Sequence, residues 1–145
     1  MKCVCIRGCP GSGKSTFAMR VFPGVFHIEN DMYHMKDGKY EFNCRKQDEA
    51  IGWCLDMCDK ALAGGMDVIV SNTFTKPGYV EAYRRIAEKY GAKFEVYRMH
   101  GEFENIHSVP AGVLQNMRGH FRDWPGEKHV YPNGDSYSVE DTARG

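Results

Sequence analysis

Eight residues near the start of the chain have the types and spacing of a phosphate-binding loop. The segment Gly8-Cys9-Pro10-Gly11-Ser12-Gly13-Lys14-Ser15 matches the pattern G-x-x-x-x-G-K-[ST] at every fixed position. In this pattern the glycines let successive backbone N–H groups point at phosphate oxygens. The lysine reaches the β- and γ-phosphates, and the following hydroxyl binds Mg²⁺. We therefore expect ATP to bind to Gly8–Ser15 and the adjoining Thr16, with Lys14 catalytic and Ser15 as the metal ligand.

Two other polar segments are candidates for the acceptor side of such a site. Phosphoryl transfer to a hydroxyl needs a carboxylate that deprotonates or orients the acceptor, and Asp31 follows an apolar strand-like run. The alternative is that Asp31 caps a turn or a helix. Asn72 and Thr73 follow another such run, where P-loop proteins often carry a metal-binding aspartate. Asn72 is neutral, so we interpret it as a residue that orients water or substrate, or as part of a strand-end turn.

The elements that must position these residues alternate along the chain. The hydrophobic patterns predict strands over 2–7, 25–29, 67–71 and 93–99, and helices over 14–20, 45–62, 76–90 and 110–120. Alternation of this kind predicts an α/β fold with a mainly parallel sheet of four to five strands and helices on both faces. A short lid is expected over 101–108, and a hairpin is possible at Asn133-Gly134. Ligands of such sheets bind beyond the carboxyl ends of the strands, which brings the three polar segments together.

Several blocks of sequence also resemble one known family. The segments GCPGSGKSTFA, FHIENDMYH, VIVSNT, AEKYGAK and VPAGVLQNM occur in order between about residues 2 and 120. They resemble the kinase domain of bacteriophage polynucleotide 5′-kinase and the small P-loop kinases around it. The resemblance implies a single P-loop kinase domain over 1–145, in which Asp31 takes the proton of a 5′-hydroxyl as that hydroxyl attacks the γ-phosphate of ATP.

The chain departs from this family at three positions. His34 stands where the phage enzyme has an arginine that touches substrate. Asn72 replaces an acid, and Glu104 occupies the place of a lid arginine that stabilises the transferred phosphoryl group. Such an arginine is worth roughly 10³–10⁵ in rate. We therefore expect another cation to take its place, with Arg118 and Arg122 assigned to the ATP site and Arg98 as a further candidate.

Aromatic and cysteine side chains carry weaker signals. Tyr33 lies beside Asp31 and His34 in the expected acceptor pocket, where it could stack on a base or pack against its neighbours. The six cysteines have spacings unlike the common zinc motifs. We interpret them as buried structural thiols, with a zinc site over Cys3, Cys5, Cys54 and Cys58 as the alternative.

Composition limits the choice of partner. The 145 residues are 42% apolar and 26% charged, with a formal net charge of zero. This balance does not favour a protein that coats long nucleic acids, although an end or a few nucleotides could still bind. No apolar run reaches the roughly 18–20 residues that span a bilayer, so we expect a cytoplasmic protein that does not contact a membrane.

Three functions are compatible with the sequence. The leading hypothesis is an ATP-dependent kinase of a 5′-hydroxyl of DNA or RNA. The second is a kinase of another hydroxyl, on a small molecule, a nucleoside or a modified base, because P-loop kinases use one site for many acceptors. The third is an ATP-binding module with little transfer activity, which the acidic Glu104 suggests. The sequence does not indicate the oligomeric state.

Overall fold

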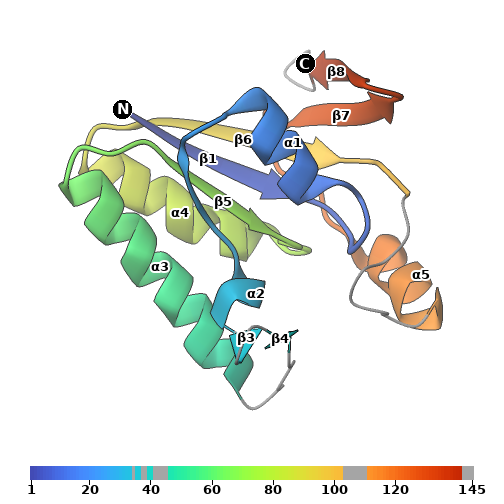
Figure 1. Cartoon of the computed structure of the whole chain (residues 1–145), viewed down its shortest axis with the longest axis horizontal. Helices are drawn as coiled ribbons and strands as arrows, with labels where there is room; N and C mark the ends of the chain where they lie inside the picture. The colour runs from blue at the N-terminus through green and yellow to red at the C-terminus, as the bar shows by residue number, and fades with distance from the viewer. Residues whose placement is uncertain (34, 37–38, 41–45, 103–110, 142–145) are drawn as a thin grey trace.

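The computed structural model describes residues 1–33, 35–36, 39–40, 46–102 and 111–141. In this part of the chain the main sheet has six strands in the order β2-β5-β1-β6-β7-β8 (Figure 1). Their bounds are β1 Lys2–Arg7, β2 Phe26–Ile28, β5 Val68–Asn72, β6 Lys93–Met99, β7 Lys128–Asn133 and β8 Ser136–Asp141. The first five strands in this order run parallel, and only β8 is antiparallel, to β7. The predicted α/β fold with a mainly parallel sheet is confirmed.

The described sheet is larger than the predicted four to five strands because of the C-terminal hairpin. Asn133-Gly134 turns the chain between β7 and β8, and β7 pairs with β6 through Tyr97 and Lys128. The sequence signal for this turn was local, but the pairing with β6 is a contact between distant segments. The hairpin therefore extends the sheet beyond the predicted edge.

Five helices connect the described strands. They are α1 Lys14–Val21, α2 Asn30–Tyr33, α3 Gln47–Ala63, α4 Pro77–Lys89 and α5 Ala111–His120. A separate pair of two-residue strands, β3 Met35–Lys36 and β4 Lys39–Tyr40, follows α2. The predicted helices are present, with each end within two residues of its expected position. The predicted lid lies mostly outside the described residues, as do His34 and Glu104.

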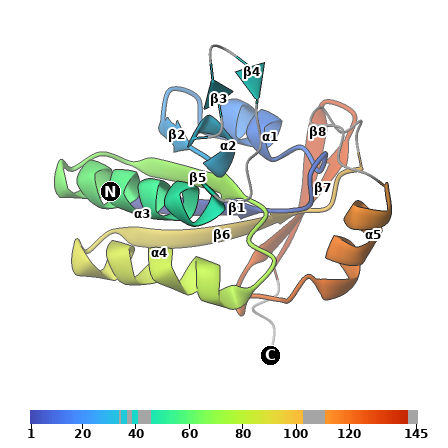
Figure 2. The same ribbon diagram turned by 90° about the horizontal axis from the view of Figure 1, so that it is seen from below.

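Alternating side chains of the central strand build two cores, one on each face of the sheet. Cys3 and Cys5 of β1 pack with buried residues of α3 and α4, whereas Val4 and Ile6 pack with Phe17 of α1. Figure 2 shows α1 and α4 on opposite sides of the strands. This is the packing expected for parallel strands that are apolar on both faces.

The thiols in the described residues contribute to one of these cores. Cys3, Cys5, Cys54 and Cys58 are fully buried, and the sulfurs of Cys3 and Cys58 lie 3.8 Å apart. Burial raises the pKa of Cys54 to about 12, and the negative charge of Glu29 adds to this rise. The interpretation of these four as buried thiols is confirmed, whereas Cys9 is only partly buried and Cys44 lies outside the described residues. No helix in the described ranges has the length and apolar character to cross a membrane.

Candidate functional site

The glycine-rich loop joins β1 to α1 at the carboxyl end of the central strand. Gly11 and Gly13 have φ values of 79° and 93°, in the left-handed region where glycine carries no Cβ penalty. A Cβ on Gly8 would lie 2.3 Å from Oγ of Ser12 and 3.1 Å from the carbonyl oxygen of Met99. Glycine at these positions is therefore required by the curled backbone and by the close approach of neighbouring strands.

Lys14 is held over the loop by two backbone carbonyls. Its Nζ donates hydrogen bonds to Gly8 O at 3.0 Å and to Cys9 O at 3.1 Å. Burial lowers the pKa of Lys14 to about 8, and the negative charge of Asp31 is the strongest influence that opposes this fall. Lys14 is therefore a partly desolvated cation in the electrostatic field of the predicted acceptor carboxylate.

The three predicted polar segments do meet at this edge of the sheet. The N–H of Gly8 donates to the carbonyl of Thr73 at 3.3 Å, which joins the glycine-rich loop to the end of β5. The N–H of Asn30 donates to Oδ1 of Asn72 at 2.6 Å. This second bond holds the start of α2, and with it Asp31 in its first turn, beside β5.

Tyr33 connects α2 to α3. Its hydroxyl donates to Oε2 of Glu49 at 2.6 Å, and its ring centroid lies 6.1 Å from that of Trp53. These contacts give Tyr33 a packing role between α2 and α3. Its proposed contact with an acceptor stays a prediction, and the one for His34 falls outside the described residues.

Ser15 has a carboxylate partner that was not predicted from the sequence. Its hydroxyl donates to Oε2 of Glu29 at 2.9 Å. The same carboxylate oxygen lies 3.6 Å from Nε2 of His27, and that nitrogen is hydrogen-bonded to Oγ of Ser71 at 2.7 Å. Glu29 stands two positions before Asp31. This E-x-D spacing after a predicted strand is the sequence pattern from which Glu29 could have been identified.

A cavity of about 240 Å³ lies between the glycine-rich loop, the end of β6 and α5. Its lining includes Gly8, Cys9, Ser12, Arg98, His100 and Arg118. The Ser12 hydroxyl is buried and makes no hydrogen bond among the described residues. Such a group is expected to be satisfied by a ligand or water. Two cations and an unpaired donor therefore face a space next to the predicted phosphate site.

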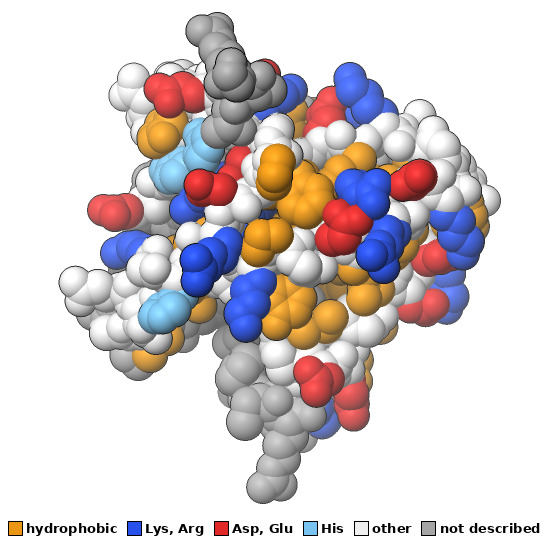
Figure 3. Space-filling view, turned by 180° about the vertical axis from the view of Figure 1, so that it is seen from behind, with side chains coloured by type: hydrophobic (Ala, Val, Ile, Leu, Met, Phe, Trp, Pro, Cys, Tyr) orange, Lys and Arg blue, Asp and Glu red, His pale blue; other side chains and the backbone are white. Residues whose placement is uncertain are grey.

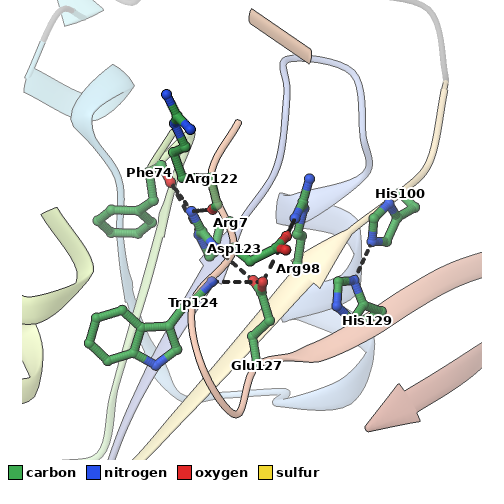
Figure 4. Close-up of polar contacts among 9 residues, drawn as sticks. All are labelled: Arg7, Phe74, Arg98, His100, Arg122, Asp123, Trp124, Glu127 and His129. Atoms are coloured by element: carbon green, nitrogen blue, oxygen red, sulfur yellow. Dashed lines mark hydrogen bonds and ion pairs between the residues drawn. The ribbon is translucent and has the colours of Figure 1, made fainter. Parts of the chain in front are cut away.

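The two arginines assigned to the ATP site are placed differently. Arg118 of α5 lines this cavity, and its Nη1 lies 3.9 Å from Oε1 of Glu102. Arg122 is not among the residues that line it. The guanidinium of Arg122 points away from the buried cluster in Figure 4, while its backbone carbonyl accepts a hydrogen bond from Arg7 at 2.6 Å. Of the pair, the structure brings Arg118 to the loop.

The side chain of Arg7 forms a buried cluster that the sequence did not reveal (Figure 4). Arg7 and Glu127 are both fully buried, and Nη1 of Arg7 donates to Oε1 of Glu127 at 2.7 Å. Nε and Nη2 of Arg7 also donate to the carbonyl of Phe74, at 3.1 and 2.6 Å. Phe74 has a φ of 47°, which is uncommon for a residue with a side chain. Arg7 therefore ties the glycine-rich loop to the turn after β5.

The same cluster reaches the end of α5. The ring centroid of Phe121 lies close to two guanidinium groups, 4.7 Å from that of Arg7 and 4.4 Å from that of Arg98. Arg98 also pairs with Asp123 at 2.5 Å. The helix that carries Arg118 is thus anchored at its C-terminal end to the strand that precedes the loop.

Comparisons with known proteins agree with this arrangement. A sequence model described as an AAA domain matches residues 4–108. An uncharacterized protein of Pasteurella multocida strain Pm70 is 30% identical over 141 residues, covering 86% of this chain and 79% of that protein.

Solved structures of several kinases have a similar fold. A gluconokinase from Sinorhizobium meliloti 1021 gives a TM-score of 0.61 at 24% identity, covering 90% of this chain and 82% of that one. An APS kinase from Mycobacterium tuberculosis gives 0.59 at 15% identity, covering 93% and 89%. A chain of the Pnkp1/Rnl/Hen1 RNA repair complex gives 0.58 at 15% identity, covering 83% of this chain and 43% of that one. At these identities the likeness establishes the fold.

Proposed function

This chain belongs to the AAA domain family, and we propose that it is a kinase that transfers the γ-phosphoryl group of ATP to a hydroxyl. Its fold is that of a P-loop kinase-type nucleotide-binding domain. The observation that carries the proposal is that hydrogen bonds to the end of β5 hold both the loop with Lys14 and the segment with Asp31 at one edge of the sheet. The negative charge of Asp31 there opposes the fall in the pKa of Lys14. A phosphate-binding cation beside a carboxylate on a neighbouring element is the minimum that transfer to a hydroxyl needs.

On the donor side, the loop and Lys14 bind the phosphates of ATP. The backbone N–H groups of Gly11–Lys14 and the positive end of α1 favour negative charge at this position. Arg118 and the unpaired hydroxyl of Ser12 are available to the nucleotide from the neighbouring cavity. Oxygen donors such as the Ser15 hydroxyl suit Mg²⁺, which when bound neutralises charge on the β- and γ-phosphates.

On the acceptor side, Asp31 accepts the proton of the attacking hydroxyl. Asn72 is 9% exposed and fixes the start of α2 through the N–H of Asn30. In this role Asn72 positions the segment that carries Asp31. Its amide adds no charge next to the acceptor, which permits acceptors that are themselves anionic.

For the acceptor, a 5′-hydroxyl of DNA or RNA is the first candidate. The support is the resemblance of the segment FHIENDMYH, which contains Asp31, to polynucleotide 5′-kinases, and the similar fold of a chain in an RNA repair complex. The second candidate is a small hydroxylated molecule. Zero net charge favours it, and so does Figure 3, in which basic and acidic side chains are interspersed on the face shown. Gluconokinase and APS kinase also share the fold.

A labelling assay separates these candidates. The protein is incubated with γ-labelled ATP, Mg²⁺ and either a 5′-hydroxyl oligonucleotide or the same oligonucleotide already 5′-phosphorylated. Label on the first alone is expected for a polynucleotide 5′-kinase. Label on neither, with label on a member of a panel of sugars, sugar acids and nucleosides, would establish the small-molecule alternative. Bound ATP without label on any acceptor would contradict the kinase proposal.

A further inference from the structure

The end of β5, where P-loop proteins often carry a metal-binding acid, has no charged side chain here. Both polar side chains at the end of β5, Ser71 and Asn72, are neutral. Each is already engaged, Ser71 with His27 and Asn72 with the N–H of Asn30. The strand that usually supplies an acid to the magnesium of P-loop proteins therefore supplies none here.

An acidic side chain reaches the same place from the neighbouring strand. Glu29 directly follows β2, which pairs with β5, and its Oε2 accepts a hydrogen bond from the Ser15 hydroxyl at 2.9 Å. The side chain of Glu29 is 23% exposed, so it is partly desolvated and still open to a ligand. A hydroxyl and a carboxylate oxygen at this separation are both hard donors on one side of the loop.

Neighbouring groups hold this carboxylate in place. Nε2 of His27 lies 3.6 Å from Oε2 of Glu29 and is hydrogen-bonded to Ser71. His27 itself belongs to β2 and is paired in register with Ile69 of β5. The orientation of Glu29 toward Ser15 is thus set by two strands of the sheet.

We propose that Glu29 is the acidic ligand of the magnesium site, acting with Ser15. Mg²⁺ in nucleotide sites is commonly held by one or two carboxylates together with phosphate oxygens and water, and Glu29 provides the carboxylate that β5 lacks. The assignment rests on the proposed function, because ATP supplies the remaining ligands. In this proposal the acidic metal ligand follows β2, whereas in other P-loop proteins it often follows the strand that corresponds to β5.

Metal binding provides the test, measured separately from catalysis. Mn²⁺ is titrated into the protein with a non-hydrolysable ATP analogue, and free Mn²⁺ is followed by electron paramagnetic resonance. Glu29→Gln is expected to weaken Mn²⁺ binding in the ternary complex by about tenfold or more. The metal-free affinity for the analogue should stay the same or tighten, because a negative charge near the phosphates is removed. The control Glu88→Gln, on an exposed face of α4, should change neither affinity.

Wild-type affinity for Mn²⁺ in Glu29→Gln, with a loss in Ser15→Ala, would overturn the assignment. If Glu29→Gln does not fold, Glu29→Asp replaces it. That variant keeps the charge on a shorter side chain, so its affinity for Mn²⁺ is expected to lie between those of wild type and Ser15→Ala. An affinity for Mn²⁺ equal to that of wild type would count against a role of Glu29 as ligand. If Glu29→Gln loses Mn²⁺ affinity as predicted but the wild-type protein transfers no phosphate to any acceptor, the kinase proposal is contradicted and the role of Glu29 remains.

Discussion

At the scale of single residues, Lys14 has the most informative environment. Its ammonium is bound to two carbonyls of the loop, and burial lowers its pKa to about 8 from an ordinary value of 10.5. In the protein without ligand, the buried charge therefore costs stability below about pH 8. This cost disappears as the pH rises from about 8 toward 10.5, because the folded state then binds fewer protons than the unfolded state.

Phosphate binding should reverse this preference, which predicts a pH-dependent affinity. A bound nucleotide stabilises the charged form of Lys14, so binding takes up a proton above about pH 8. The dissociation constant for ATP, measured by calorimetry from pH 7 to 9.5, is expected to rise by up to about tenfold per pH unit above 8. Lys14→Arg keeps its charge over this range and should show little pH dependence. An equally flat profile for the wild type would contradict the prediction.

The phosphate-binding loop could be predicted from local sequence, whereas the residues that hold it in place could not. Gly8–Ser15 is recognisable because the curled backbone itself demands glycine at fixed positions. Glu29 was overlooked because its contact with Ser15 depends on how β2 lies beside β5. In the sequence, Arg7 is simply a basic residue at the end of an apolar strand. Its partner Glu127 lies 120 positions away, at a distance no local pattern can report.

At the scale of elements, the Arg7–Glu127 pair joins segments that carry the site. It connects β1 to the start of β7, and Arg7 also holds the carbonyls of Phe74 and Arg122. The backbone N–H of Trp124 donates to the other oxygen of Glu127 at 2.9 Å. The glycine-rich loop, the turn after β5 and the end of α5 are therefore held by one buried charged group.

Removing one member of this pair should strongly destabilise the fold. Glu127→Ala leaves the fully buried guanidinium of Arg7 without its counter-charge, which typically costs about 3–5 kcal/mol. The free energy of unfolding is measured by urea denaturation. Glu81→Gln removes a partly exposed partner of Arg84 and is expected to cost no more than about 1 kcal/mol. Equal stability of Glu127→Ala and wild type would show that the pair does not hold these elements together.

The elements themselves followed from periodicity where packing was regular. Both faces of β1 are buried, and its unbroken apolar run predicted this. The short helix α2 was not predicted, because the four residues Asn30–Tyr33 are too few to show a period. Its position instead depends on the hydrogen bond to Asn72 and on the contact of Tyr33 with α3.

At the scale of the whole molecule, the sheet brings together groups that are far apart in the chain. The carboxyl ends of β1, β2 and β5 supply Lys14, Asp31 and Asn72, while α5 supplies Arg118 on the cavity side. This order of strands also places the C-terminal hairpin at the edge farthest from β2. The hairpin therefore extends the sheet without covering the acceptor side.

The role of Asp31 is tested by comparing wild type with Asp31→Asn, using the acceptor that the labelling assay identifies. The variant is nearly isosteric but cannot accept the hydroxyl proton. Transfer of the γ-phosphate is expected to fall by about 10²–10⁴-fold, while the dissociation constant for ATP with Mg²⁺ should stay within about threefold of wild type. Transfer at the wild-type rate would show that Asp31 is not the base, since the hydroxyl proton would then be taken without it.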